Sequence, residues 1–128
     1  MHILPLYASL LALLFFYLSI RTIGLRRRLK IGIGASDSHE MLRGMRVHSN
    51  FAEYVPITLL LIYLVEVQGA ASWFVHALGL CLLLGRALHA YGVSQAREKF
   101  VYRVSGMAMT FTTLLSCCAF PAYNYFAA

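Results

Sequence analysis

Charged residues are scarce in this sequence, which makes it too apolar for an ordinary small soluble domain. They account for 12% of the 128 residues, against 60% hydrophobic residues, whereas soluble domains average about 25% charged residues. Acidic residues are the scarcest, with five Asp and Glu against eleven Lys and Arg. The three cysteines are an odd number inside apolar runs, which argues against a disulfide framework or a metal site. The sequence shows no phosphate-binding loop, dinucleotide fingerprint, internal repeat or low-complexity segment.

Three stretches contain no charged residue at all, namely 1–20, 67–85 and 104–128. Each is close to the roughly 20 apolar residues that a membrane-spanning helix needs. A fourth stretch, 54–65, has only 12 uncharged residues between charged neighbours. A helix over 39–67 is nevertheless long enough, provided that its polar side chains point at protein or water and not at lipid.

These stretches predict an all-α fold, an integral membrane four-helix bundle that forms a single domain over 1–128. Asp37 and Glu40 have the spacing of a capping box at the start of the second helix, and Ser36 and Ser38 are alternative caps. The connections between the helices are short. The expected helices span about 2–25, 39–67, 72–92 and 101–125.

The basic residues predict how the chain is oriented in the membrane. All eleven lie near the first or the third expected connection, and the positive-inside rule places such connections in the cytoplasm. Both termini are then expected on the non-cytoplasmic side. A cleaved signal peptide is not expected, because the positive charges follow the first apolar run. Topology and anionic lipid explain the basic run 26–30, and nucleic-acid binding is not expected because no aromatic residues interleave with it.

Seven polar residues from three expected helices fall at one depth of the membrane. Steps of three and four residues place those of the second helix on one stripe. Snorkelling to the interface explains a single arginine at a helix end. The coincidence of seven residues predicts a cationic cavity that opens to the cytoplasm, binds an anion and pairs Glu53 with an arginine. The seven residues are Arg43, Arg46, Asn50, Glu53, Arg86, His89 and Arg103.

The segment 46–56 reads Arg-Val-His-Ser-Asn-Phe-Ala-Glu-Tyr-Val-Pro. It closely resembles the signature of the MAPEG family, the membrane-associated proteins in eicosanoid and glutathione metabolism. Its Arg-x-His-x-Asn-x-x-Glu and Glu-Tyr-x-Pro spacings are similar to those of the family's prostaglandin and leukotriene synthases. Arg86 and His89 resemble an Arg-x-x-His pair on the third helix of the family, and Arg103 resembles an arginine at the start of the last helix.

The resemblance implies a homotrimer that binds glutathione between neighbouring subunits, near the cytoplasmic face. Arg103 matches the catalytic arginine that stabilises the glutathione thiolate. Val93 replaces a tyrosine that is common in the family, and Val104 replaces a serine after the catalytic arginine, so prostaglandin synthesis is not expected. The chain looks most like the bacterial branch, and a bacterial inner membrane is its expected location. The implied glutathione-binding residues are Arg43, Arg46, His48, Asn50, Glu53, Tyr54, Arg86, His89 and Tyr91.

The activity implied by the resemblance is that of a glutathione-dependent transferase or peroxidase. A thiol with a pKa of about 8.5 is mostly protonated at neutral pH, and a nearby arginine favours its thiolate. The thiolate would attack a lipophilic electrophile or a lipid hydroperoxide that arrives from the membrane lipid. No metal is indicated.

Two other functions are compatible with the same residues. The first is a non-catalytic scaffold of the same fold that binds lipid or glutathione, which the retention of Arg86 and Arg103 disfavours. The second is a small carrier or channel that uses the polar stripe as its pathway. The carrier is disfavoured because nearly all of the charges lie at one depth.

Overall fold

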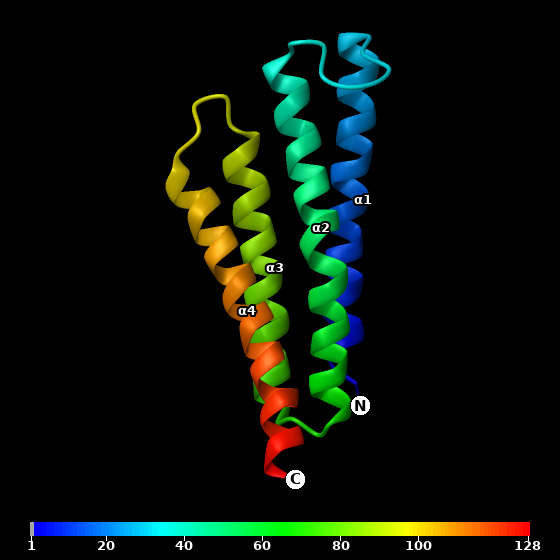
Figure 1. Cartoon of the computed structure of the whole chain (residues 1–128). Helices are drawn as coiled ribbons and strands as arrows, with labels where there is room; N and C mark the ends of the chain where they lie inside the picture. Colours follow the sequence, from blue (N-terminus) through cyan, green and yellow to red (C-terminus); the bar gives the residue numbers. More distant parts are fainter. Residues whose placement is uncertain (1) are drawn as a thin grey trace.

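The computed structural model describes residues 2–128, which form four helices joined by three connections (Figure 1). All four helices are long and apolar enough to cross a membrane, so the prediction of an all-α four-helix membrane bundle is confirmed. The helices are α1 (Leu4–Leu29), α2 (His39–Val67), α3 (Ser72–Ser94) and α4 (Phe100–Ala127).

The helices α1, α3 and α4 end two to four residues later than the sequence indicated. The difference is largest in α1, whose last turn contains Arg26, Arg27 and Arg28. Cations in a last turn interact favourably with the helix dipole, so the basic run is part of the helix and not of the connection. Lys30 then ends α1 in the left-handed conformation, with φ of 55°.

Polar groups satisfy the free backbone N–H groups at two helix starts. The Ser38 hydroxyl accepts a hydrogen bond from the Met41 N–H at 3.2 Å and caps α2. The capping box expected at Asp37 is therefore wrong, because Asp37 adopts a left-handed backbone with φ of 60° one residue before the cap. At the opposite end of the bundle, the Glu66 carboxylate accepts from the N–H groups of Ile3 and Leu4 and caps α1.

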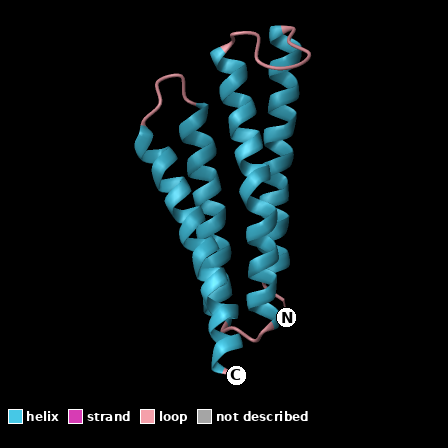
Figure 2. Ribbon diagram, viewed as in Figure 1, coloured by secondary structure: helices cyan, strands magenta, loops and turns pink. Residues whose placement is uncertain are grey.

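The two middle helices are central to the packing. Among residues 2–128, α2 and α3 each contact all three other helices, whereas α1 and α4 do not contact each other. Figure 2 shows the first and third connections at one end of the bundle, and the second connection with both termini at the other end. Both basic connections therefore lie at the same end, as expected, and the side of the membrane that they face stays a prediction.

The α3–α4 pair makes the closest approach between helices. A Cβ added at Gly106 would lie 2.6 Å from the Gly85 carbonyl oxygen and 2.6 Å from the backbone nitrogen of His89. Such distances exclude any side chain at this position unless the backbones move apart. The small residues therefore hold α4 against the part of α3 that contains Arg86 and His89.

The outer faces of the bundle are strongly apolar. Large hydrophobic side chains point outward, such as Leu13, Phe16 and Leu115, which are 64–68% exposed. A soluble bundle would direct side chains of this kind into its core. These faces are suited to contact with lipid acyl chains or with another protein chain in the membrane.

Candidate functional site

Arg86 joins three helices from a fully buried position in α3, where it is only 1% exposed. Its Nη1 donates to the Asn50 side-chain oxygen on α2 at 2.6 Å. Its Nη2 donates to the Met107 sulfur on α4 at 3.2 Å. Its Nε is buried and has no hydrogen-bond partner among residues 2–128. Because a buried donor without a partner costs about 1–3 kcal/mol, this nitrogen is suited to an acceptor from outside the chain.

Two further side chains border Arg86. Tyr54 lies within electrostatic reach of Arg86, and its ring packs edge-on against Phe111 with the ring centroids 5.5 Å apart. His89 lies one helical turn after Arg86 and is buried. It stands within electrostatic reach of Arg46, Arg86, Glu98 and Arg103, so these groups surround one region.

Glu98 lies in the connection between α3 and α4 and binds arginines from two different helices. It accepts from Arg43 of α2 at 2.9 Å and from Arg103 of α4 at 3.5 Å. Arg43 also donates to the Val93 carbonyl near the end of α3, at 3.2 Å. The Glu98 side chain is only 7% exposed, so the carboxylate fixes the three segments relative to one another.

The second acidic residue of the region pairs with Arg46. Arg46 Nη1 lies 3.6 Å from Glu53 Oε1, and the two side chains are 55% and 50% exposed. The prediction that Glu53 pairs with an arginine is confirmed. Both residues remain accessible from outside the protomer, and the charge of Arg46 also acts on His89.

We call the charged and polar side chains around Arg86, His89 and Glu98 the arginine cluster. It contains four arginines and two glutamates, so two positive charges are not neutralised by acidic side chains. Within residues 2–128, no group of His, Cys, Asp and Glu is arranged to hold a metal ion. A surplus of guanidinium groups with an unpaired buried N–H is suited to bind a carboxylate or another anion. The members are Arg43, Arg46, Asn50, Glu53, Tyr54, Arg86, His89, Glu98 and Arg103.

A comparison of the whole chain with models of protein families tests the resemblance. The family model described as the MAPEG family matches residues 4–123. The chain belongs to the MAPEG family. It is also similar to the inner membrane protein YecN of Escherichia coli strain K12, with 38% identity over 110 residues, which cover 86% of this chain and 82% of YecN. The YecN of E. coli O6:H1 strain CFT073 matches with the same identity and coverage.

Two residues of the MAPEG-like pattern lie away from the arginine cluster. His48 points from α2 toward α1, where its Nε2 lies 3.0 Å from the Ser19 hydroxyl. Its ring stacks on Phe15 with the centroids 4.9 Å apart. Tyr91 is 56% exposed and packs edge-on against the ring of Tyr102. Within one protomer, neither side chain joins the other MAPEG positions.

The sequence did not predict two residues that contact the arginines of the cluster, Glu98 and Met107. Glu98 is the only acidic residue after Glu66 in this MAPEG chain, and that isolation among basic residues was a usable signal. Met107 gives no comparable signal, because a methionine in an apolar span is most simply a packing residue. The contact of any cluster member with glutathione stays a prediction.

Proposed function

We propose that this MAPEG protein is a membrane glutathione-dependent transferase or peroxidase. In this proposal the arginine cluster binds glutathione, and Arg103 stabilises its thiolate for attack on a lipophilic electrophile or a lipid hydroperoxide. Family membership supports the choice of ligand. The observation that favours this site is Arg86, a buried cation whose Nε donor lacks a partner in the described part of the chain.

The charge of glutathione complements the charge of the cluster. The peptide has two carboxylates and one ammonium group, so it carries one net negative charge, and its thiolate adds a second. The cluster offers two positive charges that are not neutralised. Each unit by which the thiol pKa falls below about 8.5 requires about 1.4 kcal/mol of preferential stabilisation of the thiolate. One arginine close to the sulfur is sufficient for a shift of that size.

In this proposal some residues of the cluster bind the peptide and another activates its thiol. Arg86 is buried and already hydrogen-bonded to the partly buried Asn50, so the two residues form a rigid surface on which a carboxylate of the peptide binds. Arg103 is 47% exposed and is held loosely by Glu98, so its guanidinium is free to approach the sulfur. The apolar second substrate would enter laterally from the lipid.

The exposure of the cluster supports a homotrimer as part of this proposal. Arg46, Glu53 and Arg103 are each about half exposed, although they lie in helices that are suited to cross a membrane. Charged groups at membrane depth normally face protein or water. A neighbouring subunit would cover this side of α2 and α4 and complete the glutathione site. We place the protein in a bacterial inner membrane, with both termini on the non-cytoplasmic side.

Equilibrium binding of glutathione to the detergent-purified protein tests the proposed site. We expect Asn50→Ala to weaken binding at least about tenfold, or about 1.4 kcal/mol, because Arg86 loses its oxygen partner. Asn124→Ala is the matched control, since Asn124 bonds Gln68 at the opposite end of the bundle. Glutathione binding without turnover of any electrophile or hydroperoxide would favour the scaffold, and absence of binding to the folded native protein would contradict the proposal.

A further inference from the structure

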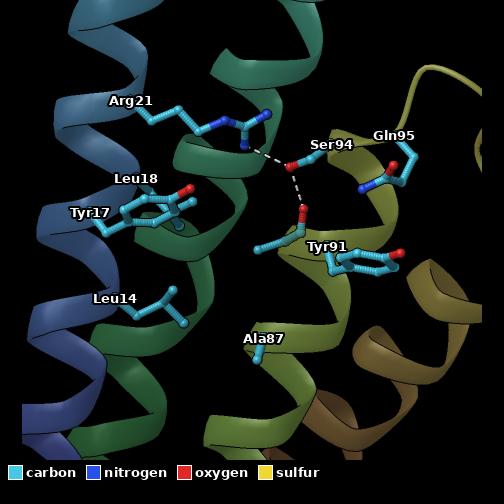
Figure 3. Close-up of a pocket in the computed structure, with 9 residues that line it drawn as sticks. Leu14, Tyr17, Leu18, Arg21, Ala87, Tyr91, Ser94 and Gln95 are labelled. Atoms are coloured by element: carbon cyan, nitrogen blue, oxygen red, sulfur yellow. Dashed lines mark hydrogen bonds between the residues drawn. The ribbon is translucent and has the colours of Figure 1, made fainter.

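A second basic site lies between α1 and α3 and borders Arg43 of the arginine cluster at one end. Arg21 of α1 reaches across to α3 and donates to the Ser94 hydroxyl at 2.6 Å (Figure 3). Ser94 in turn donates to the Ala90 carbonyl. Arg86 points in the other direction, toward α2 and α4. The guanidinium groups of Arg21 and Arg86 therefore lie on different sides of α3.

Arg21 differs from the other partly buried arginines in its partners. Arg43 and Arg103 share Glu98, Arg46 pairs with Glu53, and Arg26 donates to three backbone carbonyls. Within residues 2–128, Arg21 has a single neutral hydroxyl as its partner and no carboxylate within 4 Å. Its positive charge therefore remains available to an anionic group.

Two cavities adjoin this guanidinium. One has a volume of about 410 Å³ and the other about 550 Å³, and both are lined by Arg21 and Ser94. The larger cavity is also lined by Glu40 and by Arg43 of the arginine cluster. Figure 3 shows the first cavity with Arg21, Ser94 and Gln95 at one end and Leu14 and Ala87 at the other. Leu18 and the rings of Tyr17 and Tyr91 also line the cavity. We call this trough between α1 and α3 the Arg21 groove.

The depth of Arg21 matches the level of phospholipid headgroups. It follows Leu4, the first residue of α1, by 17 residues, which corresponds to about 25 Å along a helix. The hydrocarbon layer of a bilayer is about 30 Å thick. Arg21 thus lies near the boundary of that layer, on the side of the basic connections, and the apolar part of the groove extends toward the middle of the membrane.

We propose that the Arg21 groove binds one anionic phospholipid from the leaflet on the side of the basic connections. The lipid phosphate accepts hydrogen bonds from Arg21, with Ser94 and Gln95 beside it. One acyl chain lies in the trough against Leu14 and Ala87. Basic pockets between membrane helices are known to select anionic headgroups in this way. This site does not depend on glutathione binding or on catalysis.

Native mass spectrometry of the detergent-purified protein tests the proposal with two lipids of the same acyl chains, phosphatidylglycerol and phosphatidylcholine. We expect the native protein to prefer phosphatidylglycerol by about fivefold, the effect of one basic side chain at a membrane surface. Arg21→Gln should abolish the preference. Arg27→Gln, which removes an exposed arginine of the same helix end, should retain it.

A second variant fills the trough and keeps the charge. Ala87 is on the surface of α3, so Ala87→Phe is expected to leave the fold intact while it weakens phosphatidylglycerol binding. Equal binding of the two lipids to the native protein would overturn the proposal. So would an equal loss of preference in both arginine variants, because that result describes diffuse attraction to the whole basic end. Unchanged binding to Ala87→Phe would contradict the acyl-chain part of the groove.

Discussion

At the scale of single residues, Glu98 organises the arginine cluster. Its carboxylate is nearly buried and binds Arg43 and Arg103 from two helices. Without it, two guanidinium groups would repel each other near His89, and the α3–α4 connection would lose its polar anchor. The carboxylate also neutralises one of the four arginine charges, so it limits the positive charge that an anionic ligand meets.

We predict that Glu98→Gln destabilises the protein by about 1–2 kcal/mol, between the values typical of exposed and of buried ion pairs. The measurement is the free energy of unfolding in detergent. Glu40→Gln is the matched control, because Glu40 pairs with Arg28 while both side chains are more than half exposed. An equal effect of the two substitutions would show that Glu98 is an ordinary surface residue.

The sequence predicted most of the arginine cluster, and helix geometry explains why two of the expected residues lie outside it within one protomer. An α-helix turns by about 100° per residue, so Asn50 and Glu53 share a stripe with Arg46. His48 follows Arg46 by two residues and must point to the other side of α2. Tyr91 follows His89 by two residues and differs in the same way. The family resemblance included both residues, although the helical spacing separates them from the stripe within one protomer.

Other contacts could not be predicted from spacing. Glu98 lies in a connection, where helical periodicity gives no direction for a side chain. Its two arginine partners are 55 residues before it and five residues after it. The Arg21–Ser94 hydrogen bond joins residues 73 apart. Such contacts depend on how the helices pack, which composition and hydropathy leave open.

At the scale of helices, the contact of α3 with α4 positions the cluster. Gly85 and Gly106 let the two backbones approach closely, as small residues commonly do between membrane helices. This approach brings Met107 to the Nη2 of Arg86. The positions of Arg86 and His89 relative to α4 therefore depend on the absence of side chains at this crossing.

We predict that Gly106→Ala destabilises the protein by about 1–3 kcal/mol, because its Cβ would collide with backbone atoms that have no alternative position. Thermal unfolding in detergent measures the effect. Gly24→Ala is the control, since a Cβ at Gly24 would meet nothing among residues 2–128 within 4 Å except its chain neighbours and its own helical backbone, and alanine should stabilise a helix by up to about 1 kcal/mol there. A tolerated Gly106→Ala would contradict the close α3–α4 contact.

At the scale of the whole molecule, the four-helix fold leaves charged groups on an outer face. Arg46, Glu53 and Arg103 lie on helices whose other outward residues are mostly apolar. The length and hydropathy of the chain were enough to predict three membrane helices, and the fourth, over 39–67, also required that its polar side chains avoid lipid. They could not determine how protomers assemble, because lipid-facing and subunit-facing surfaces are both apolar.

We predict that the purified protein sediments as three chains of 14.4 kDa in density-matched detergent. Glu53→Arg should dissociate this trimer, because Arg46 would lose its acidic partner and unpaired positive charges would be buried under the neighbouring subunit. Glu40→Arg changes an exposed glutamate near the basic connections and should leave the trimer intact. A monomeric native protein would contradict the assembly, and dissociation by both substitutions would show that the effect is not specific to the face around Glu53.

Activation of the glutathione thiol is the central claim, and the ultraviolet absorbance of bound thiolate against pH tests it most directly. We predict that the native protein lowers the thiol pKa from about 8.5, that Arg103→Ala returns it toward that value, and that Arg97→Ala leaves the lowered pKa unchanged. Arg97 is exposed in the same connection as Glu98 and is the matched control. Glutathione bound with an unshifted thiol pKa in the native protein would contradict the account.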